Sequence, residues 1–75
     1  MKELALFVVK RLVDKPEAVS VEESRDGDVA VLRLVVDDSD KGKVIGKQGK
    51  VIKAIRAVVG AAATKAGKQV AVEID

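Results

Sequence analysis

Residues 41–56 read KGKVIGKQGKVIKAIR, and this stretch carries more information about the fold than any other part of the chain. Its two glycines, Gly46 and Gly49, enclose the polar pair Lys47-Gln48, and the stretch holds six cations and no acid. Glycines allow a tight turn and place no Cβ in the way of another backbone that approaches closely. If a helix begins at this turn, its unpaired N–H groups favour an anion. The predicted ligand is therefore phosphate, and a sugar–phosphate strand fits best.

The basic residues near the glycines differ in how directly we expect them to contact phosphate. Lys47 and Lys50 lie in or next to the turn and are the strongest candidates. Lys43 is expected to reach the same strand from the preceding helix. Lys53 and Arg56 lie further along the following helix, where a merely solvated side chain is an equal alternative.

Apolar residues beside the turn are expected mainly in the core, with a second role next to the ligand. Val44 and Ile45 are candidate contacts, and part of Val44 is predicted to form the floor of a groove for bases. The edge of the second strand, with Leu34 and Val36, is expected to complete that floor. Phe7 is the only aromatic residue, so stacking platforms worth about 1–3 kcal/mol per base are absent. The sequence thus predicts modest affinity and weak sequence preference.

Other phosphate-site and catalytic motifs fit poorly. A Walker A loop needs four residues between its glycines and a hydroxyl residue after the lysine, whereas Gly42 and Gly46 are separated by three and Gln48 follows Lys47. The glycine spacing also fails the dinucleotide fingerprint. The chain contains no Cys, His, Tyr or Trp, so we expect no enzyme activity and no cofactor.

Three carboxylates precede the short helix that leads to the turn. Asp37, Asp38 and Asp40 are arranged either to bind magnesium or to cap a helix start, where acids favour the positive end of the dipole. Ser39 is also interpreted as a cap. The capping interpretation is favoured, and no metal site is predicted.

Composition limits the chain to one small domain over residues 1–75. Its 75 residues are 48% hydrophobic and 35% charged, which suits a globular fold built on an aliphatic core. The longest apolar run near the amino end, Leu4–Val9, is too short for a signal-peptide core or a membrane span. The absence of cysteine suits a reducing compartment. We therefore expect a soluble, cytoplasmic protein.

The formal net charge of +2 conceals a strong asymmetry. Residues 1–40 carry six cations and ten acids, whereas residues 41–75 carry eight cations and two acids. A basic half of this kind is typical of proteins that bind nucleic acid or another anionic surface. Binding to an anionic membrane is the poorer alternative, because the lysines flank a turn and not an amphipathic helix face.

The rest of the chain is predicted to form helices and strands around the glycine turn. A first helix ends before Pro16, and the pair Asp26-Gly27 predicts a hairpin. The branched run Val29–Val36 indicates a central strand, and the two-helix connection after it should make the last strand parallel to it. The predicted elements are helix 2–14, a short strand from Val19, strand Val29–Val36, a short helix ending at Ile45, helix 50–66 and strand 69–74. The expected fold is α+β, in the order α-β-β-α-α-β.

The pattern Ile-Gly-x-x-Gly-x-x-Ile-x-x-Ile, here from Ile45 to Ile55, resembles the signature of KH domains. In those domains a GXXG loop binds the backbone of about four nucleotides of a single strand. The whole chain is similar to the free-standing single-KH-domain RNA-binding proteins of bacteria, the KhpA family. The resemblance implies a type II KH fold, with a three-stranded mixed sheet and helices packed on one face.

This resemblance also implies a function and a partner. The expected function is single-stranded RNA binding as an RNA chaperone or post-transcriptional regulator. The expected partner is a second copy of the chain or a larger KH-containing protein of the KhpB (Jag) type. An alternative remains open, in which the protein is an interaction subunit of a KH-containing complex and binds RNA only weakly.

The long helix also carries a candidate partner surface. Small, uncharged side chains lie between its basic ridge and its core side, and small residues permit close helix approach. The alternative is a helix flank that packs against its own sheet. The residues of this predicted strip are Ala54, Ala57, Val58 and Ala61, and those expected in the core are Val51, Ile52, Ile55, Val59, Ala62 and Ala66.

Overall fold

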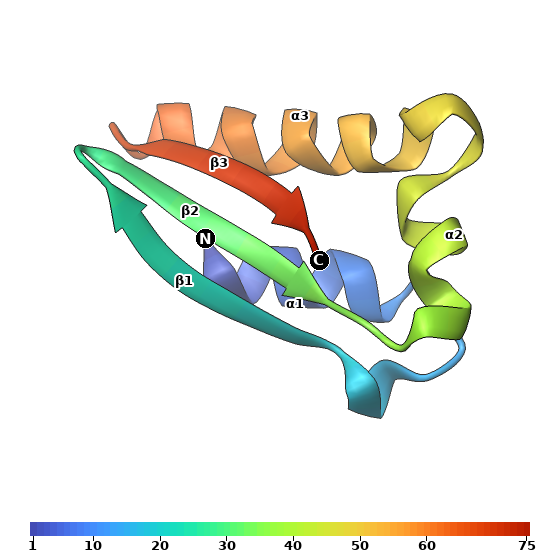
Figure 1. Cartoon of the computed structure of the whole chain (residues 1–75). Coiled ribbons are helices and arrows are strands. Elements are labelled where there is room, and N and C mark those ends of the chain that lie inside the picture. Colours follow the sequence, from blue (N-terminus) through green and yellow to red (C-terminus); the bar gives the residue numbers. More distant parts are fainter.

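The structure, a computed structural model, describes residues Met1 to Asp75 and has the predicted element order (Figure 1). Its three α-helices are α1 (Lys2–Lys10), α2 (Lys41–Ile45) and α3 (Lys50–Lys65). None of them combines the length and the apolar character that a membrane-crossing helix needs. The predicted α+β class is confirmed.

The sheet contains β1 (Ser20–Asp26), β2 (Val29–Val35) and β3 (Gln69–Ile74), with β2 in the centre. The hairpin makes β1 and β2 antiparallel, and the two-helix crossover makes β2 and β3 parallel, as predicted. A central strand has both edges paired. The groove floor predicted at the edge of β2 is therefore wrong, because β2 has no free edge to offer a base.

The core lies between the sheet and the helices α1 and α3. Leu32 and Leu34 of β2 are fully buried, since alternate side chains of a strand face the same side. Ala63 takes the buried position predicted for Ala62, and Ala66 lies beyond the last residue of α3. The buried residues of α3 are Ile52, Ile55, Val59 and Ala63, at three- and four-residue intervals.

Helix α1 ends at Lys10, four residues earlier than predicted. The segment before Pro16 leaves the helical path because the backbone N–H groups of Asp14 and Lys15 donate to the Asp40 carboxylate. Two large apolar side chains in and just after α1 are exposed, Phe7 at 60% and Leu12 at 38%.

The two ends of the molecule differ. The connection between α2 and α3 lies at one end, and the β1–β2 hairpin turn lies at the other (Figure 1). The sheet face opposite the helices is open, and Arg33 there pairs with Glu22 and lies 3.8 Å from the Asp75 carboxylate.

Candidate nucleic-acid interface

The GXXG loop, Gly46–Gly49, joins α2 to α3 through a backbone that only certain residues adopt readily. Gly46 has φ 75° and ψ 172°, and Gly49 has φ 74° and ψ 16°. Gln48 between them has φ 57° and ψ 26°, and it is the only residue other than glycine with a positive φ. Strained backbone of this kind persists where the surrounding structure imposes it, and it is frequent at functional sites.

The two glycines are required for different reasons. A Cβ added at Gly46 would lie 2.4 Å from Cγ2 of Val51 and 2.8 Å from its backbone nitrogen. At Gly49 the nearest atom, Cγ2 of Ile52, is at an ordinary contact distance of 3.9 Å. Gly46 is therefore needed both for its positive φ and because the loop packs tightly on α3, whereas Gly49 is needed for its positive φ alone.

No side chain caps the amino terminus of α3. Gly49 is its N-cap, and its first turn contains no acid. The Lys47, Gln48 and Lys50 side chains around it are exposed. Neither Lys47 nor Lys50 forms an ion pair in the structure, so their charges add to the positive end of the helix dipole.

Lys43 has a different environment from Lys47 and Lys50. Its ammonium group contacts the Asp14 carboxylate and lies 3.8 Å from an oxygen of Asp40. The hydrogen bond to Asp14 raises the pKa of Lys43. Its positive charge is thus already compensated by acids from two segments.

Asp40 is a residue whose role the sequence analysis missed. It is 1% exposed, and its two carboxylate oxygens accept the N–H groups of Asp14 at 3.2 Å and Lys15 at 3.0 Å. It therefore holds the segment after α1 against α2 instead of capping its own helix. A sequence offers no signal for such a bond, because the partners lie 25 and 26 residues apart.

Asp37 does act as the predicted cap. Its carboxylate accepts the Ser39 N–H at 3.0 Å and the Ser39 hydroxyl at 2.5 Å. These hydrogen bonds hold the pKa of Asp37 below its ordinary value. Ser39 is the donor in this arrangement and not the cap that the sequence suggested.

The apolar candidates divide between core and surface. Val44 is fully buried, so the base contact predicted for its side chain is wrong and it belongs to the core. Ile45 is 37% exposed and presents apolar surface immediately before the loop. Lys53 is exposed without an ion pair, and Nε of Arg56 donates to the Val72 carbonyl at 2.9 Å.

Helix α3 has two contrasting flanks. Arg56 lies on the flank that faces β3, where its bond to Val72 reaches the outer edge of the sheet. The other flank meets α1 and forms a shallow cavity of about 170 Å³, which we call the apolar groove. Its lining residues are Val8, Leu12, Val51, Ala54, Ile55 and Val58.

The predicted strip borders this apolar groove. Ala54, Ala57, Val58 and Ala61 are all exposed, and Val58 is 50% exposed. Only Ala54 and Val58 line the groove itself. The alternative in which the strip packs against the sheet of its own chain is therefore wrong.

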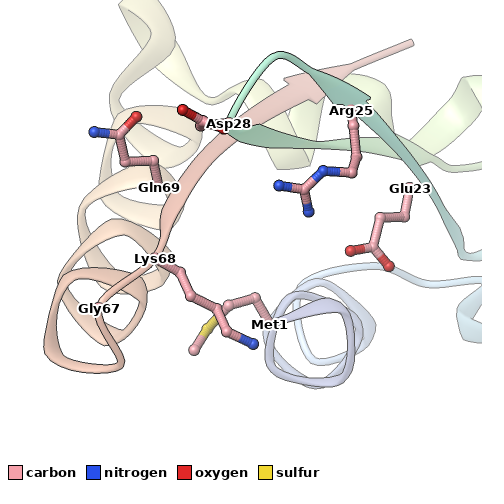
Figure 2. A pocket seen from close by; sticks show the side chains of 7 residues that line it. All are labelled: Met1, Glu23, Arg25, Asp28, Gly67, Lys68 and Gln69. Atoms are coloured by element: carbon pink, nitrogen blue, oxygen red, sulfur yellow. The ribbon is translucent and has the colours of Figure 1, made fainter.

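The largest cavity lies away from the GXXG loop, beside the hairpin turn. It has a volume of about 430 Å³ and is lined by charges of both signs. Figure 2 shows Arg25 and Glu23 of β1 on one side and Lys68, just before β3, on the other. None of the three cavities in the structure is lined by residues 46–49, so the loop itself contains no base pocket.

The family model described as "KhpA/KhpB, KH domain" matches residues 2–74. The chain belongs to the KhpA/KhpB KH-domain family. Among curated members, RNA-binding protein KhpA of Clostridium perfringens is 55% identical over 74 residues, and the alignment covers 99% of each chain. RNA-binding protein KhpA of Clostridium acetobutylicum is 50% identical with the same coverage.

Solved structures extend the KhpA/KhpB comparison to the fold. Crystal structures of Era match 97% of the chain at 19% identity, and the match spans 28% of each Era chain. The TM-score is 0.65 for Aquifex aeolicus Era bound to GDP and aluminium fluoride. It is 0.60 for Era in complex with MgGDPNP and nucleotides 1506–1542 of 16S ribosomal RNA. The KH fold expected from the sequence is confirmed.

Proposed function

We propose that the protein binds single-stranded RNA through the GXXG loop. Backbone N–H groups at the start of α3, together with Lys47 and Lys50, hold consecutive phosphates of the strand. The observation that carries the proposal is the uncapped amino terminus of α3 beside lysines that have no carboxylate partner. The name of the KhpA relatives supports the same ligand.

Base recognition contributes little in this proposal. Ile45 offers apolar surface next to the loop, and Lys53 is placed one helical turn beyond Lys50. No aromatic side chain and no cavity accompanies them. The protein therefore binds backbone more than sequence, which suits a non-enzymatic RNA chaperone or post-transcriptional regulator in the cytoplasm.

The salt dependence of binding distinguishes this narrow contact from a diffuse one. Each phosphate contact on a single strand contributes about −0.7 to the slope of log affinity against log salt concentration. Two or three contacts at the loop predict a slope of roughly −2. Fluorescence anisotropy with a labelled oligouridylate over a range of salt concentrations measures it. A slope near about −6 would mean that many phosphates touch a broad basic surface, contrary to the proposal.

We further propose that the strip Ala54, Ala57, Val58 and Ala61, with the apolar groove beside it, binds a partner of the same family. The partner is a second copy of the chain or a larger KH-containing protein of the KhpB (Jag) type. Support comes from two exposed apolar side chains, Val58 of α3 and Leu12 in the turn after α1, and from the gain in stability that a small domain obtains by association. If RNA binding proves very weak, this surface favours the alternative function of an interaction subunit.

Charges placed in the strip should disrupt self-association. In a two-fold contact, Ala57→Glu or Ala61→Glu places a carboxylate near the same carboxylate of the other copy, and the two negative charges repel. The fold of each copy should be preserved, because both positions are exposed and glutamate is compatible with a helix. Analytical ultracentrifugation at matched concentrations is expected to show a dimeric parent and monomeric variants. Ala18→Glu, exposed in the turn before β1, adds the same charge elsewhere and should stay dimeric. A monomeric parent, or dimeric strip variants, would refute this surface.

A further inference from the structure

Lys43 is the one cation of the loop region that a distant acid neutralises. Its partner Asp14 comes from the segment after α1, 29 residues earlier in the chain. Lys43 also lies 3.8 Å from Asp40, three residues before it, and Lys41 pairs with its near neighbour Asp38 at 3.1 Å. Lys47 and Lys50 have no acidic partner at all.

The two acids around Lys43 differ in how firmly they are held. Asp40 is 1% exposed, and its oxygens are occupied by the N–H groups of Asp14 and Lys15. The Asp14 side chain is 77% exposed, and its carboxylate contacts no group other than Lys43. Asp40 is thus a fixed neighbour that orients Lys43, whereas Asp14 can move into solvent at little cost.

We propose that Asp14 limits the affinity of the protein for RNA by competing with a phosphate group for Lys43. This inference rests on the proposed function, because it assigns a regulator to the same RNA-binding surface. Lys43 lies on α2, three residues before Gly46 in the chain, and the proposal assigns its ammonium group a phosphate adjacent to those held at the GXXG loop. When RNA binds, the phosphate and the Asp14 carboxylate compete for the Lys43 ammonium group. The free energy of binding gained from the phosphate contact is then partly offset by the loss of the contact with Asp14.

The expected consequence is that removing the Asp14 charge tightens binding. Asp14→Asn keeps the backbone N–H that bonds to Asp40 and removes only the competing charge. Exposed ion pairs are weak, so the expected gain in affinity is roughly two- to five-fold. A newly available phosphate contact should also make the salt slope steeper by about 0.7.

The experiment compares four variants with the parent in anisotropy titrations against one labelled oligouridylate. Asp14→Asn tests the proposal, and Glu17→Gln is the matched control, because it removes an exposed charge from the same segment without releasing a lysine. Lys43→Gln in the parent is expected to weaken binding, because it removes a proposed phosphate ligand and leaves the Asp14 carboxylate without its partner. In the double variant Asp14→Asn with Lys43→Gln, the gain should disappear. Thermal unfolding of each variant verifies that it folds.

The outcomes separate this inference from the proposed function. If Asp14→Asn raises RNA affinity no more than Glu17→Gln does, or if the higher affinity persists in the double variant, the effect comes from long-range charge and not from Lys43. Either result would overturn this inference and leave the proposed function standing. A parent that fails to bind the oligonucleotide would overturn the proposed function and this inference together. A gain that requires Lys43 supports both.

Discussion

Replacing Gly46 with alanine is expected to lower the free energy of unfolding by about 3–5 kcal/mol. Two costs combine, because the backbone at φ 75° and ψ 172° suits glycine almost alone, and the new Cβ would overlap Val51 at 2.4 Å. The new Cβ would also lie 2.8 Å from both Cβ and the backbone nitrogen of Val51, and rotation of the Val51 side chain moves neither of these atoms away. For a domain of this size the melting temperature should fall by at least about 12 °C in circular dichroism.

Two other glycines serve as controls for this result. Gly49→Ala adds a Cβ in ordinary contact and costs only its positive φ, about 1–2 kcal/mol. Gly60 lies inside α3 with nothing within 4 Å of an added Cβ, so Gly60→Ala should stabilise the protein by up to about 1 kcal/mol. Equal melting temperatures for the Gly46 and Gly49 variants would show that the contact between the loop and Val51 is wrong.

The double variant Lys47→Asp with Gln48→Asp is expected to lose RNA binding by about 100-fold or more. It changes the charge of the GXXG loop by three units at the position proposed for the phosphates. Folding should be preserved because both side chains are exposed, and aspartate adopts the left-handed backbone of Gln48 comparatively well. The melting temperature should therefore shift by only a few degrees while binding is lost.

The neutral variant Lys47→Asn with Gln48→Asn is the matched control for the charge. Asparagine has nearly the same shape and backbone preference as aspartate, so it removes the Lys47 contact without adding repulsion. It should weaken binding much less than the aspartate pair does. If the aspartate pair binds oligouridylate as the parent does, phosphates are not held at the GXXG loop.

The fold was predictable because each of its determinants is local in the sequence. Asp26-Gly27 specifies the hairpin, and the branched run of β2 specifies a strand whose neighbours follow from the connections on either side. The errors concern tertiary contacts. Helix α1 ends early because Asp40 takes the N–H groups of Asp14 and Lys15, and no periodicity in the sequence reveals a competing acceptor so far away.

The candidate site was predictable in its composition but not in its detailed environment. The glycine spacing located the turn, and the lysines around it are where the sequence placed them. Burial of Val44 was not evident, because an apolar residue before a glycine turn fits core and surface equally well. Nor does the sequence show that Lys43 is neutralised, since Asp14 precedes it by 29 residues.

The opposite flanks of α3 have a consequence for long RNA molecules. A dimer formed through the apolar groove would leave the Arg56 flanks and both GXXG loops unobstructed on one rigid body. A strand held at one loop would then meet the second at a high effective concentration, and such linkage can raise overall affinity by about 10²–10⁴. Two weak backbone contacts would thus suffice to retain a long transcript, while fragments too short to span both loops would dissociate quickly.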